Sequence, residues 1–327
     1  MPRIRLFLCA NLSPKACLCW EREIASRRSA QRTAAVTELP SSPPDSVLSA
    51  LADAVPHHAT PTGWTLLHGG RTNTAWHGTC EGASDVVLKL YAGAARNPLF
   101  PNDPNAEETL LRLLAPRGIA PTFVASFDTD HGRCNLYEHL PGDTWYMDTP
   151  AVARLMRLLH ILPAPEGLRS ACDGSAALVR QTLEIVGKCG VVPAFLSDLP
   201  EGAVQPSGRQ TLLHADIVPG NVIQTGGKLK LIDWQCPAVG DPCEDIAIFL
   251  SPAMQQLYRG RPLSEQETDA FFIAYDDENV AERYRRLAPF YHARMAAYCL
   301  WQVENDRPAY GDGLQLEVTA LQRSLRP

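Results

Sequence analysis

The sequence predicts an α+β fold of two lobes, a small N-terminal lobe built on an antiparallel sheet with one helix and a larger, mainly helical C-terminal lobe. Short strand-like runs bounded by Gly, Pro and Asn occupy much of residues 64–140, with one helical segment among them. From residue 151 on, apolar residues recur mostly at helical spacing. About 280 residues follow a basic leader, which is enough for one such unit with a sizeable core.

The leader differs in charge from the rest of the chain. Residues 1–36 carry a formal charge of +5 and the remainder −11, for a total of −6. The apolar run Ile4–Ala10 is short for a secretory signal, and no clear small-residue cleavage site follows it. A transit-like or signal segment stays an alternative to a disordered extension or a start codon placed too early. We expect residues 1–45 to be a disordered leader, 46–140 the N-terminal nucleotide-binding lobe and 141–327 the C-terminal catalytic and substrate lobe.

The small lobe begins with three predicted strands. Trp64–His68, Ala75–Thr79 and Val86–Tyr91 favour strands, the last with Lys89 inside an apolar run. Gly69 and Gly70 form a turn between the first two. Such a turn lets backbone N–H groups approach a phosphate because no Cβ intervenes.

A helix and two more strands complete this lobe. Asn105–Gly118 has an apolar leucine stripe, with Asn105 as the expected N-cap and Pro116 and Gly118 ending the helix. Residues 122–127 and 134–140 favour an antiparallel pair, broken by Pro141-Gly142. The C-terminal lobe is predicted to contain helices over residues 151–160, 176–188, 265–275, 281–298 and 314–325.

Residues 213–250 contain the side chains that point most directly to chemistry. Asp216 and Asn221 are five positions apart, His214 precedes them, and Asp233 follows a predicted hairpin whose turn is Gly226-Gly227. That hairpin would place Asn221 beside Asp233 and Asp216 at the same end. Mg-dependent phosphoryl transfer needs a carboxylate beside the attacking hydroxyl and oxygen ligands for the metal. Each residue alone fits an ordinary turn or cap, but the three linked spacings together favour this chemistry.

These motifs resemble those of the aminoglycoside phosphotransferase and choline kinase superfamily, which has a protein-kinase-like fold. HADIVPGN is similar to the family's H-G-D-x-x-x-x-N loop, and LIDWQCPAVGDPCEDIA to its I-D-[WF] segment followed by G-D-P-x-x-D-[IL]-A. The resemblance implies that Asp216 is the catalytic base or hydroxyl orienter, that Asn221 and Asp233 hold Mg2+, and that His214 braces the loop. It also implies structural roles for Asp241 and Asp245.

The same resemblance implies a nucleotide clamp in the small lobe. The string G-G-x-T-N, with Gly69, Gly70, Thr72 and Asn73, followed by Trp76, is similar to the phosphate-loop region of choline, ethanolamine and thiamine kinases. Lys89 fits the strand lysine that holds the α- and β-phosphates of ATP, partnered by Glu107 or Glu108 of the next helix. Glu107 is preferred, because Glu107 and Leu111 match the family's Glu-x-x-x-Leu spacing. The segment Glu138, His139 and Leu140 resembles the hinge whose backbone faces adenine.

The acceptor is expected to be a small hydroxylated metabolite like choline, ethanolamine or thiamine. An alkyl-ammonium group is well held by aromatic faces with an acid nearby, and the C-terminal part offers Tyr291, Tyr298, Trp301, Glu304 and Asp306. Gln235 stands where choline kinases tend to carry Glu. An aminoglycoside kinase is the alternative, with Asp276, Asp277 and Glu278 hinting at an acidic cleft. A non-catalytic nucleotide-binding regulator is a third.

Composition excludes or disfavours several classes of function. The acidic body argues against nucleic acid as the main partner. No apolar run approaches 18 residues, so we expect no membrane span. Three of the ten cysteines lie in the leader and the others are scattered without C-x-x-C spacing, which favours free thiols in a reducing cytoplasm. The oligomeric state stays open.

Overall fold

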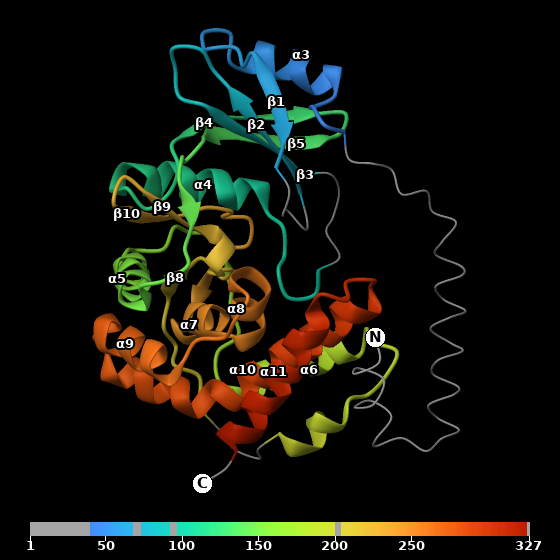
Figure 1. Ribbon diagram of the computed structural model, residues 1–327, viewed down its shortest axis with the longest axis vertical. Coiled ribbons are helices and arrows are strands. Elements are labelled where there is room, and N and C mark those ends of the chain that lie inside the picture. The colour runs from blue at the N-terminus through green and yellow to red at the C-terminus, as the bar shows by residue number, and fades with distance from the viewer. Residues whose placement is uncertain (1–39, 68–72, 92–96, 200–203, 326–327) are drawn as a thin grey trace.

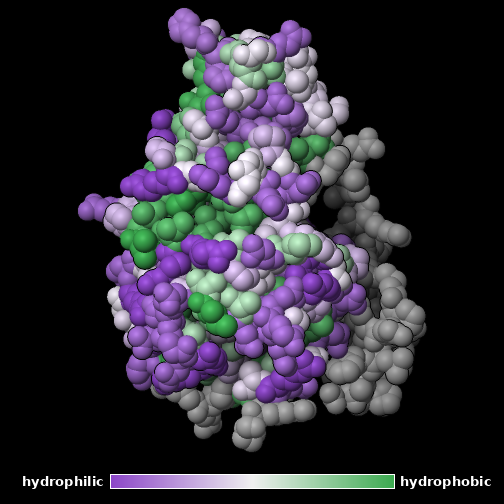
Figure 2. All heavy atoms as spheres, turned by 60° about the vertical axis from the view of Figure 1, so that its left-hand side comes forward, coloured by the Kyte–Doolittle hydropathy of each residue, from purple (hydrophilic) through white to green (hydrophobic). Residues whose placement is uncertain are grey.

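The chain folds into two lobes, one dominated by an antiparallel sheet and the other by helices (Figure 1). The structure is a computed structural model and describes residues 40–67, 73–91, 97–199 and 204–325. The sheet lobe stands above the larger helical lobe in Figure 1, and the chain passes from one to the other after β5. On the side shown in Figure 2, hydrophobic side chains gather at the level where the lobes meet. The α+β, two-lobed prediction is confirmed.

The small lobe contains a five-stranded sheet in the order β1-β2-β3-β5-β4. All neighbouring strands are antiparallel. Every residue of the central strand β3 is buried, which explains why this segment is an apolar run rather than an alternating one. The strands are β1 (Gly63–Leu66), β2 (Thr74–Thr79), β3 (Val86–Tyr91), β4 (Phe123–Thr129) and β5 (Gly132–Glu138).

Two helices cover the opposite faces of this sheet. Helix α4 (Pro104–Leu114) packs Leu110 and Leu111 in one core with Val87 of β3. Helix α3 (Asp45–Ala54), which we did not predict, packs Val47 and Leu51 with Leu88 on the other face. Alternate side chains of β3 therefore enter different cores, as the period of a strand requires.

The expected N-cap of α4 was wrong by two residues. The cap is Asp103, whose side chain accepts hydrogen bonds from the backbone N–H groups of Asn105 and Ala106. Pro104 occupies the first helical position, where its missing N–H costs nothing. The helix continues into a short 3-10 turn (η1, Ala115–Arg117) and ends at Gly118, which has a φ of 72°.

The large lobe holds the five helices predicted there and two shorter ones. The described helices are α5 (Thr149–His160), α6 (Ser175–Val186), α7 (Cys243–Leu250), α8 (Pro252–Arg259), α9 (Glu265–Tyr275), α10 (Glu278–Glu304) and α11 (Tyr310–Ser324). The family resemblance implied a helix beginning near Asp245, and α7 is that helix. Every residue of α7 is buried, so it has no amphipathic pattern that periodicity alone could detect. The remaining elements are η2 (Ala194–Asp198), η3 (Pro219–Asn221), and the strands β6 (Asp143–Thr144), β7 (Arg169–Ser170), β8 (Thr211–Leu213), β9 (Val222–Thr225), β10 (Lys228–Leu231) and β11 (Ala238–Gly240).

The predicted hairpin is formed by β9 and β10. Its turn is Gly226-Gly227, with φ angles of 55° and 73°, as a tight turn between twisted strands requires. The N–H of Ile232 donates to the backbone oxygen of Asn221 at 3.0 Å. Asp233 therefore lies beside Asn221 at the open end of the hairpin, as expected.

Residues 97–103, which precede α4, lie against the large lobe (Figure 1). Leu99 and Phe100 are buried in the same core as Tyr298 of α10. The side-chain amide of Asn97 donates to the Tyr298 hydroxyl at 3.0 Å. The N–H of Asp103 donates to the backbone oxygen of Gln235 at 2.8 Å. This segment therefore ties the lobes together on one side of the space between them.

Helix α7 fixes the loop that follows β8. Its Asp245 is fully buried, and the two carboxylate oxygens accept the N–H groups of His214 at 3.0 Å and Ala215 at 2.6 Å. The Nε2 atom of His160 lies 3.0 Å from the same carboxylate. Ala215 is held at a φ of 60°, a left-handed conformation that costs a residue with a Cβ about 1–2 kcal/mol. Asp241 likewise contacts the Arg283 guanidinium of α10 at 2.6 Å, so both acids serve the packing.

We predict that Ala215→Gly stabilises the protein, because glycine adopts the left-handed conformation without strain. After subtraction of the extra entropy of the unfolded chain, the free energy of unfolding should rise by about 0.5–1 kcal/mol. Urea denaturation measures this change. Ala270→Gly, inside α9, is the control and should instead lose about 1 kcal/mol. A loss at both positions would show that the loop at Ala215 is not strained.

We predict the opposite result for Gly142→Ala between β5 and β6. Gly142 has a φ of 145°, and an added Cβ would lie 2.1 Å from the backbone oxygen of Gln224. The backbone would have to move, so the free energy of unfolding should fall by more than about 2 kcal/mol. Gly82→Ala, with a φ of 72° and open space around it, should cost about half as much. Equal losses in the two variants would contradict this close contact.

Candidate active site

A cavity of about 460 Å³ lies between the lobes and receives side chains from both. From the small lobe it is lined by Asn73, Lys89, Glu138, His139 and Leu140, and from the large lobe by Asp216, Asn221 and Asp233. Glu107 and His214 are buried next to it but do not contribute to its described lining. Gly69, Gly70 and Thr72 lie outside the described residues. Most of the site residues predicted from the sequence thus meet around one interlobe cavity.

Lys89 lies at the centre of this arrangement and is almost fully buried. Its Nζ contacts Glu107 Oε1 at 2.8 Å and Asp233 Oδ1 at 2.5 Å. Burial alone would lower the pKa of Lys89, but the carboxylates of Asp233 and Glu107 outweigh it and raise this pKa well above its usual value. Lys89 is therefore a fixed cation that bridges the two lobes.

The structure distinguishes between the two glutamates of α4. Glu107 points inward, where the Tyr91 hydroxyl and the side-chain amide of Asn135 also donate to it. Glu108 lies nearer the surface and pairs with Arg112 and Arg133. Because Glu107 has a hydrogen-bond donor for both oxygens, the buried carboxylate holds the lysine in place at a lower desolvation cost.

The loop after β8 is braced by His214, which is fully buried. Its Nε2 lies 3.0 Å from the backbone oxygen of Ile232, and its Nδ1 accepts the N–H of Asp216 at 3.2 Å. The ring also packs on Trp234, with centroids 4.3 Å apart. Burial lowers the pKa of His214, so the imidazole is neutral. His214 thus joins the loop that carries Asp216 to the strand end that carries Asp233.

Asp216, Asn221 and Asp233 present oxygen atoms on the same wall of the cavity. The side-chain amide of Asn221 donates to the backbone oxygen of Asp216 at 2.9 Å. This hydrogen bond engages the amide nitrogen and leaves the amide oxygen as the candidate metal ligand. Burial, and then the charge of Asp233, raise the pKa of Asp216 well above its usual value. Two carboxylates and an amide oxygen are the ligand types that Mg2+ prefers. The donor set fits such an ion, with Asn221 and Asp233 as the candidate ligands.

Asn73 belongs to a cluster of amide side chains that crosses the lobe boundary. Its Nδ2 donates to Gln235 at 2.7 Å and to Asn102 at 2.9 Å, and Asn102 donates back at 2.7 Å. Sequence reasoning missed Asn102, because no local pattern marks a contact between residues so far apart. The Gln235 amide is thus engaged within the protein.

Another part of the cavity has an aromatic wall from four separate parts of the chain. It is formed by Phe100, Tyr258, Tyr298 and Tyr310, with Met254 beside them. The ring of Tyr298 contacts Phe100 and Tyr310 edge to face, with centroid separations of 5.2 and 5.8 Å. We call these four aromatic residues the aromatic wall. Sequence reasoning found only Tyr298, because the others come from unrelated segments.

The aromatic group proposed from α10 alone was therefore mostly wrong. Trp301 stacks behind Tyr298 at 6.0 Å, and Tyr291 is buried against the Arg294 guanidinium at 5.1 Å. Glu304 accepts the N–H of Gly190. Within the described lining of the cavity, Tyr298 is the one member of that group. Tyr291 and Tyr298 are buried in different cores.

Two further expectations, on membrane spans and on cysteines, can be compared with the described residues. Within the described residues, no helix is both long enough and apolar enough to cross a bilayer. The cysteines in this part of the chain are all free thiols.

The comparisons with known proteins agree with this geometry. Residues 63–290 match the model of the phosphotransferase enzyme family. No match was found among curated protein sequences.

Solved structures with the same fold include several kinases. A choline/ethanolamine kinase family protein from Mesorhizobium loti has 17% identity and a TM-score of 0.58, covering 85% of this chain and 99% of that one. Choline kinase LicA from Streptococcus pneumoniae has 18% identity and a TM-score of 0.56, covering 80% and 94%. Amicoumacin kinase hAmiN, solved with AMP-PNP, Ca2+ and Ami, has 15% identity and a TM-score of 0.51, covering 85% and 92%.

The family match spans well over half of the sequence, and the similar structures share the arrangement of the two lobes. The chain therefore belongs to the phosphotransferase enzyme family and has the protein-kinase-like fold that its motifs implied.

Proposed function

We propose that the protein is an ATP-dependent kinase that transfers the γ-phosphate to a hydroxyl group of a small metabolite. The observation that carries this proposal is the meeting of Lys89, Asp216, Asn221 and Asp233 on one interlobe cavity. A cation for the phosphates, a carboxylate for the hydroxyl and oxygen ligands for a metal are the parts that phosphoryl transfer needs. The family match supports the same reaction class.

The proposed roles follow from the contacts of each side chain. Asp216 accepts the proton of the acceptor hydroxyl or orients that group for attack. Asn221 and Asp233 hold Mg2+, which neutralises charge on the triphosphate. Lys89 binds the α- and β-phosphates and keeps its position because Glu107 is anchored on both oxygens. Asp233, which contacts Lys89 in this structure, would be a ligand of the metal ion when one is bound.

Adenine is proposed to bind at the segment Glu138–Leu140, which lines the cavity. The N–H groups of Glu138 and His139 already donate to the backbone oxygens of Thr122 and Asp85. Recognition of adenine therefore falls to the other main-chain groups of this segment. The prediction that the phosphate loop consists of Gly69, Gly70, Thr72 and Asn73 still stands as a proposal.

The aromatic wall supports an acceptor of the choline, ethanolamine or thiamine type. Aromatic faces attract an alkyl-ammonium group, more strongly when the site excludes water. The acids that would suit an aminoglycoside lie elsewhere: Asp277 caps α10, and Glu278 pairs with Arg285. Asp276 ends α9, and the described lining of the cavity includes none of the three. The free cysteines support the proposed cytoplasmic location.

We predict that an ADP-release screen with Mg-ATP finds turnover on a small amino alcohol. The acceptors are choline, ethanolamine, thiamine, amino sugars and aminoglycosides, so that the leading and alternative substrate classes are compared directly. Asp216→Asn keeps the size of the side chain but removes the base, and should lower kcat by about 10²–10⁴-fold. Its affinity for Mg-ATP should stay within a few-fold of the wild type.

Asp130→Asn is the matched control, because Asp130 is exposed in the turn between β4 and β5. It should keep wild-type turnover. Unchanged turnover in Asp216→Asn would remove Asp216 from its role. Nucleotide binding without turnover on any of these acceptors would instead favour a non-catalytic regulator.

A further inference from the structure

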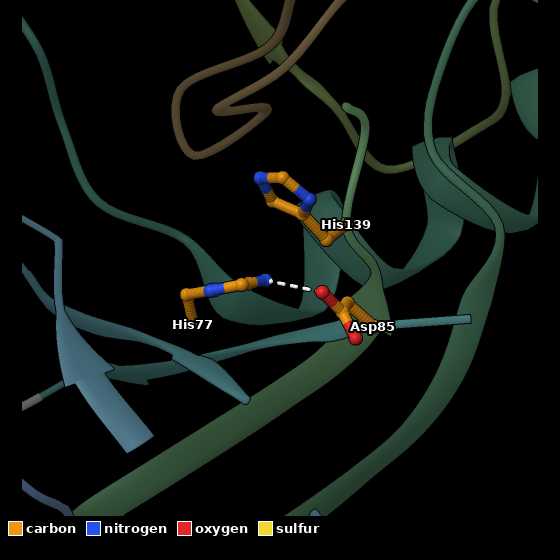
Figure 3. Close-up of side chains that lie close together, drawn as sticks. All are labelled: His77, Asp85 and His139. Atoms are coloured by element: carbon orange, nitrogen blue, oxygen red, sulfur yellow. Dashed lines mark hydrogen bonds and ion pairs between the residues drawn. The ribbon is translucent and has the colours of Figure 1, made fainter. Parts of the chain in front are cut away.

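A second group of potential metal ligands lies near one end of the interior strands β2, β3 and β5, beside the segment proposed to face adenine. His77 is on β2, Asp85 directly precedes β3, and His139 directly follows β5 (Figure 3). One ligand atom from each side chain lies within 4.8 Å of the other two. All three residues are half-buried. These atoms are not used by the proposed phosphoryl transfer.

The strand register brings the three side chains to one face of the sheet. His77 is directly opposite Val87 on the neighbouring strand, so their side chains share a face. Asp85 precedes Val87 by two residues and therefore points the same way. The N–H of His139 donates to the backbone oxygen of Asp85 at 2.7 Å, next to the pair formed by Val86 and Glu138. The pairing of β2, β3 and β5 therefore brings the side chains of His77, Asp85 and His139 together.

The carboxylate of Asp85 is oriented by the protein. Its Oδ1 accepts the N–H of Cys80 at 2.9 Å, and its Oδ2 contacts His77 Nε2 at 2.9 Å. The two imidazole rings lie close together, with centroids 4.4 Å apart and an angle of 51° between their planes. In Figure 3 the ring of His139 lies over the contact between the other two residues. The hydrogen bond from the Cys80 N–H to Asp85 fixes the direction of this carboxylate. Hydrogen bonds to ligating carboxylates have the same effect around known metal sites.

We propose that His77, Asp85 and His139 form a site for a divalent transition metal of the zinc class. Two imidazoles and one carboxylate are a donor set for Zn2+ and its neighbours, whereas Mg2+ prefers oxygen ligands. Metal–ligand bonds of about 2.0–2.1 Å place tetrahedral ligands about 3.3 Å apart, so small side-chain rotations bring the three atoms into place. Three protein ligands leave a fourth position for water or another small donor.

The bound metal would tie together the ends of three neighbouring strands. His139 also lines the interlobe cavity, so the site is continuous with the segment between the lobes. This three-residue site exists only in the folded state, because its residues come from separate strands, so an ion bound there favours folding over any weaker binding to the unfolded chain. The ion therefore stabilises the small lobe by mass action, and the melting temperature rises with metal concentration.

The test uses the full-length protein after removal of metals with a chelator. Zn2+ binding is measured by calorimetry for the wild type and for His77→Ala, Asp85→Asn and His139→Ala. Because free cysteines can also bind Zn2+, the quantity of interest is the difference between wild type and variants. We expect each variant to lose one equivalent of Zn2+, or to bind it at least about 100-fold more weakly. The Zn2+-dependent rise in melting temperature should be lost in parallel.

His131→Ala is the matched control, because His131 is an exposed histidine in the turn between β4 and β5. It should bind Zn2+ like the wild type, and excess Mg2+ should not compete. Pulsed electron paramagnetic resonance of the Cu2+-loaded wild type gives a result that does not depend on any variant folding, and it should detect two imidazole ligands.

Either of two results would overturn the site. One is equal stoichiometry and affinity for Zn2+ in the wild type and all three variants. The other is a Cu2+ spectrum that shows fewer than two imidazoles. In that case the three side chains form only a hydrogen-bonded cluster.

Discussion

The buried contacts of Lys89 hold the two lobes in their relative positions. The cation sits on β3, its first partner Glu107 on α4, and its second partner Asp233 after the hairpin of the large lobe. Taking a lysine out of water costs several kcal/mol, so the charge requires partners from both lobes. Removal of one partner from such a buried pair typically costs about 3–5 kcal/mol. The same contacts place the cation on the wall of the cavity, where the proposed reaction needs it.

Much of the site could be predicted because it depends on local rules. The glycine turn between β9 and β10 sets the register that puts Asn221 beside Asp233. Lys89 and Glu107 were assigned through the family resemblance, because a lysine in an apolar strand or a glutamate in the first turn of a helix does not by itself mark a site. Long-range packing is different, because no local pattern marks the contact of Leu99 and Phe100 with the core of the large lobe. The Asp103 cap did have a local signal, an Asp followed by Pro104 at the first helical position, and that signal was overlooked.

The cavity combines two kinds of wall with different origins. The wall for the metal and the phosphates comes from short motifs whose spacing is legible in the sequence. The aromatic wall is assembled from Phe100, Tyr258, Tyr298 and Tyr310, which lie before α4 and on α8, α10 and α11. Family membership therefore accounts for the first wall, and we propose that the second recognises the acceptor. Ala215 connects the first wall to the helical core, because Asp245 of α7 holds it in a strained conformation.

We propose that Asp233 would exchange its contact with Lys89 for a metal ion when ATP binds. The direct measurement is the affinity for ATP as a function of Mg2+ concentration, in the wild type and in Asp233→Asn, by calorimetry. In the wild type, Mg2+ should tighten ATP binding at least about tenfold, equivalent to about 1.4 kcal/mol. In the variant, this dependence on Mg2+ should be largely lost. The same dependence on Mg2+ in both proteins would contradict the account.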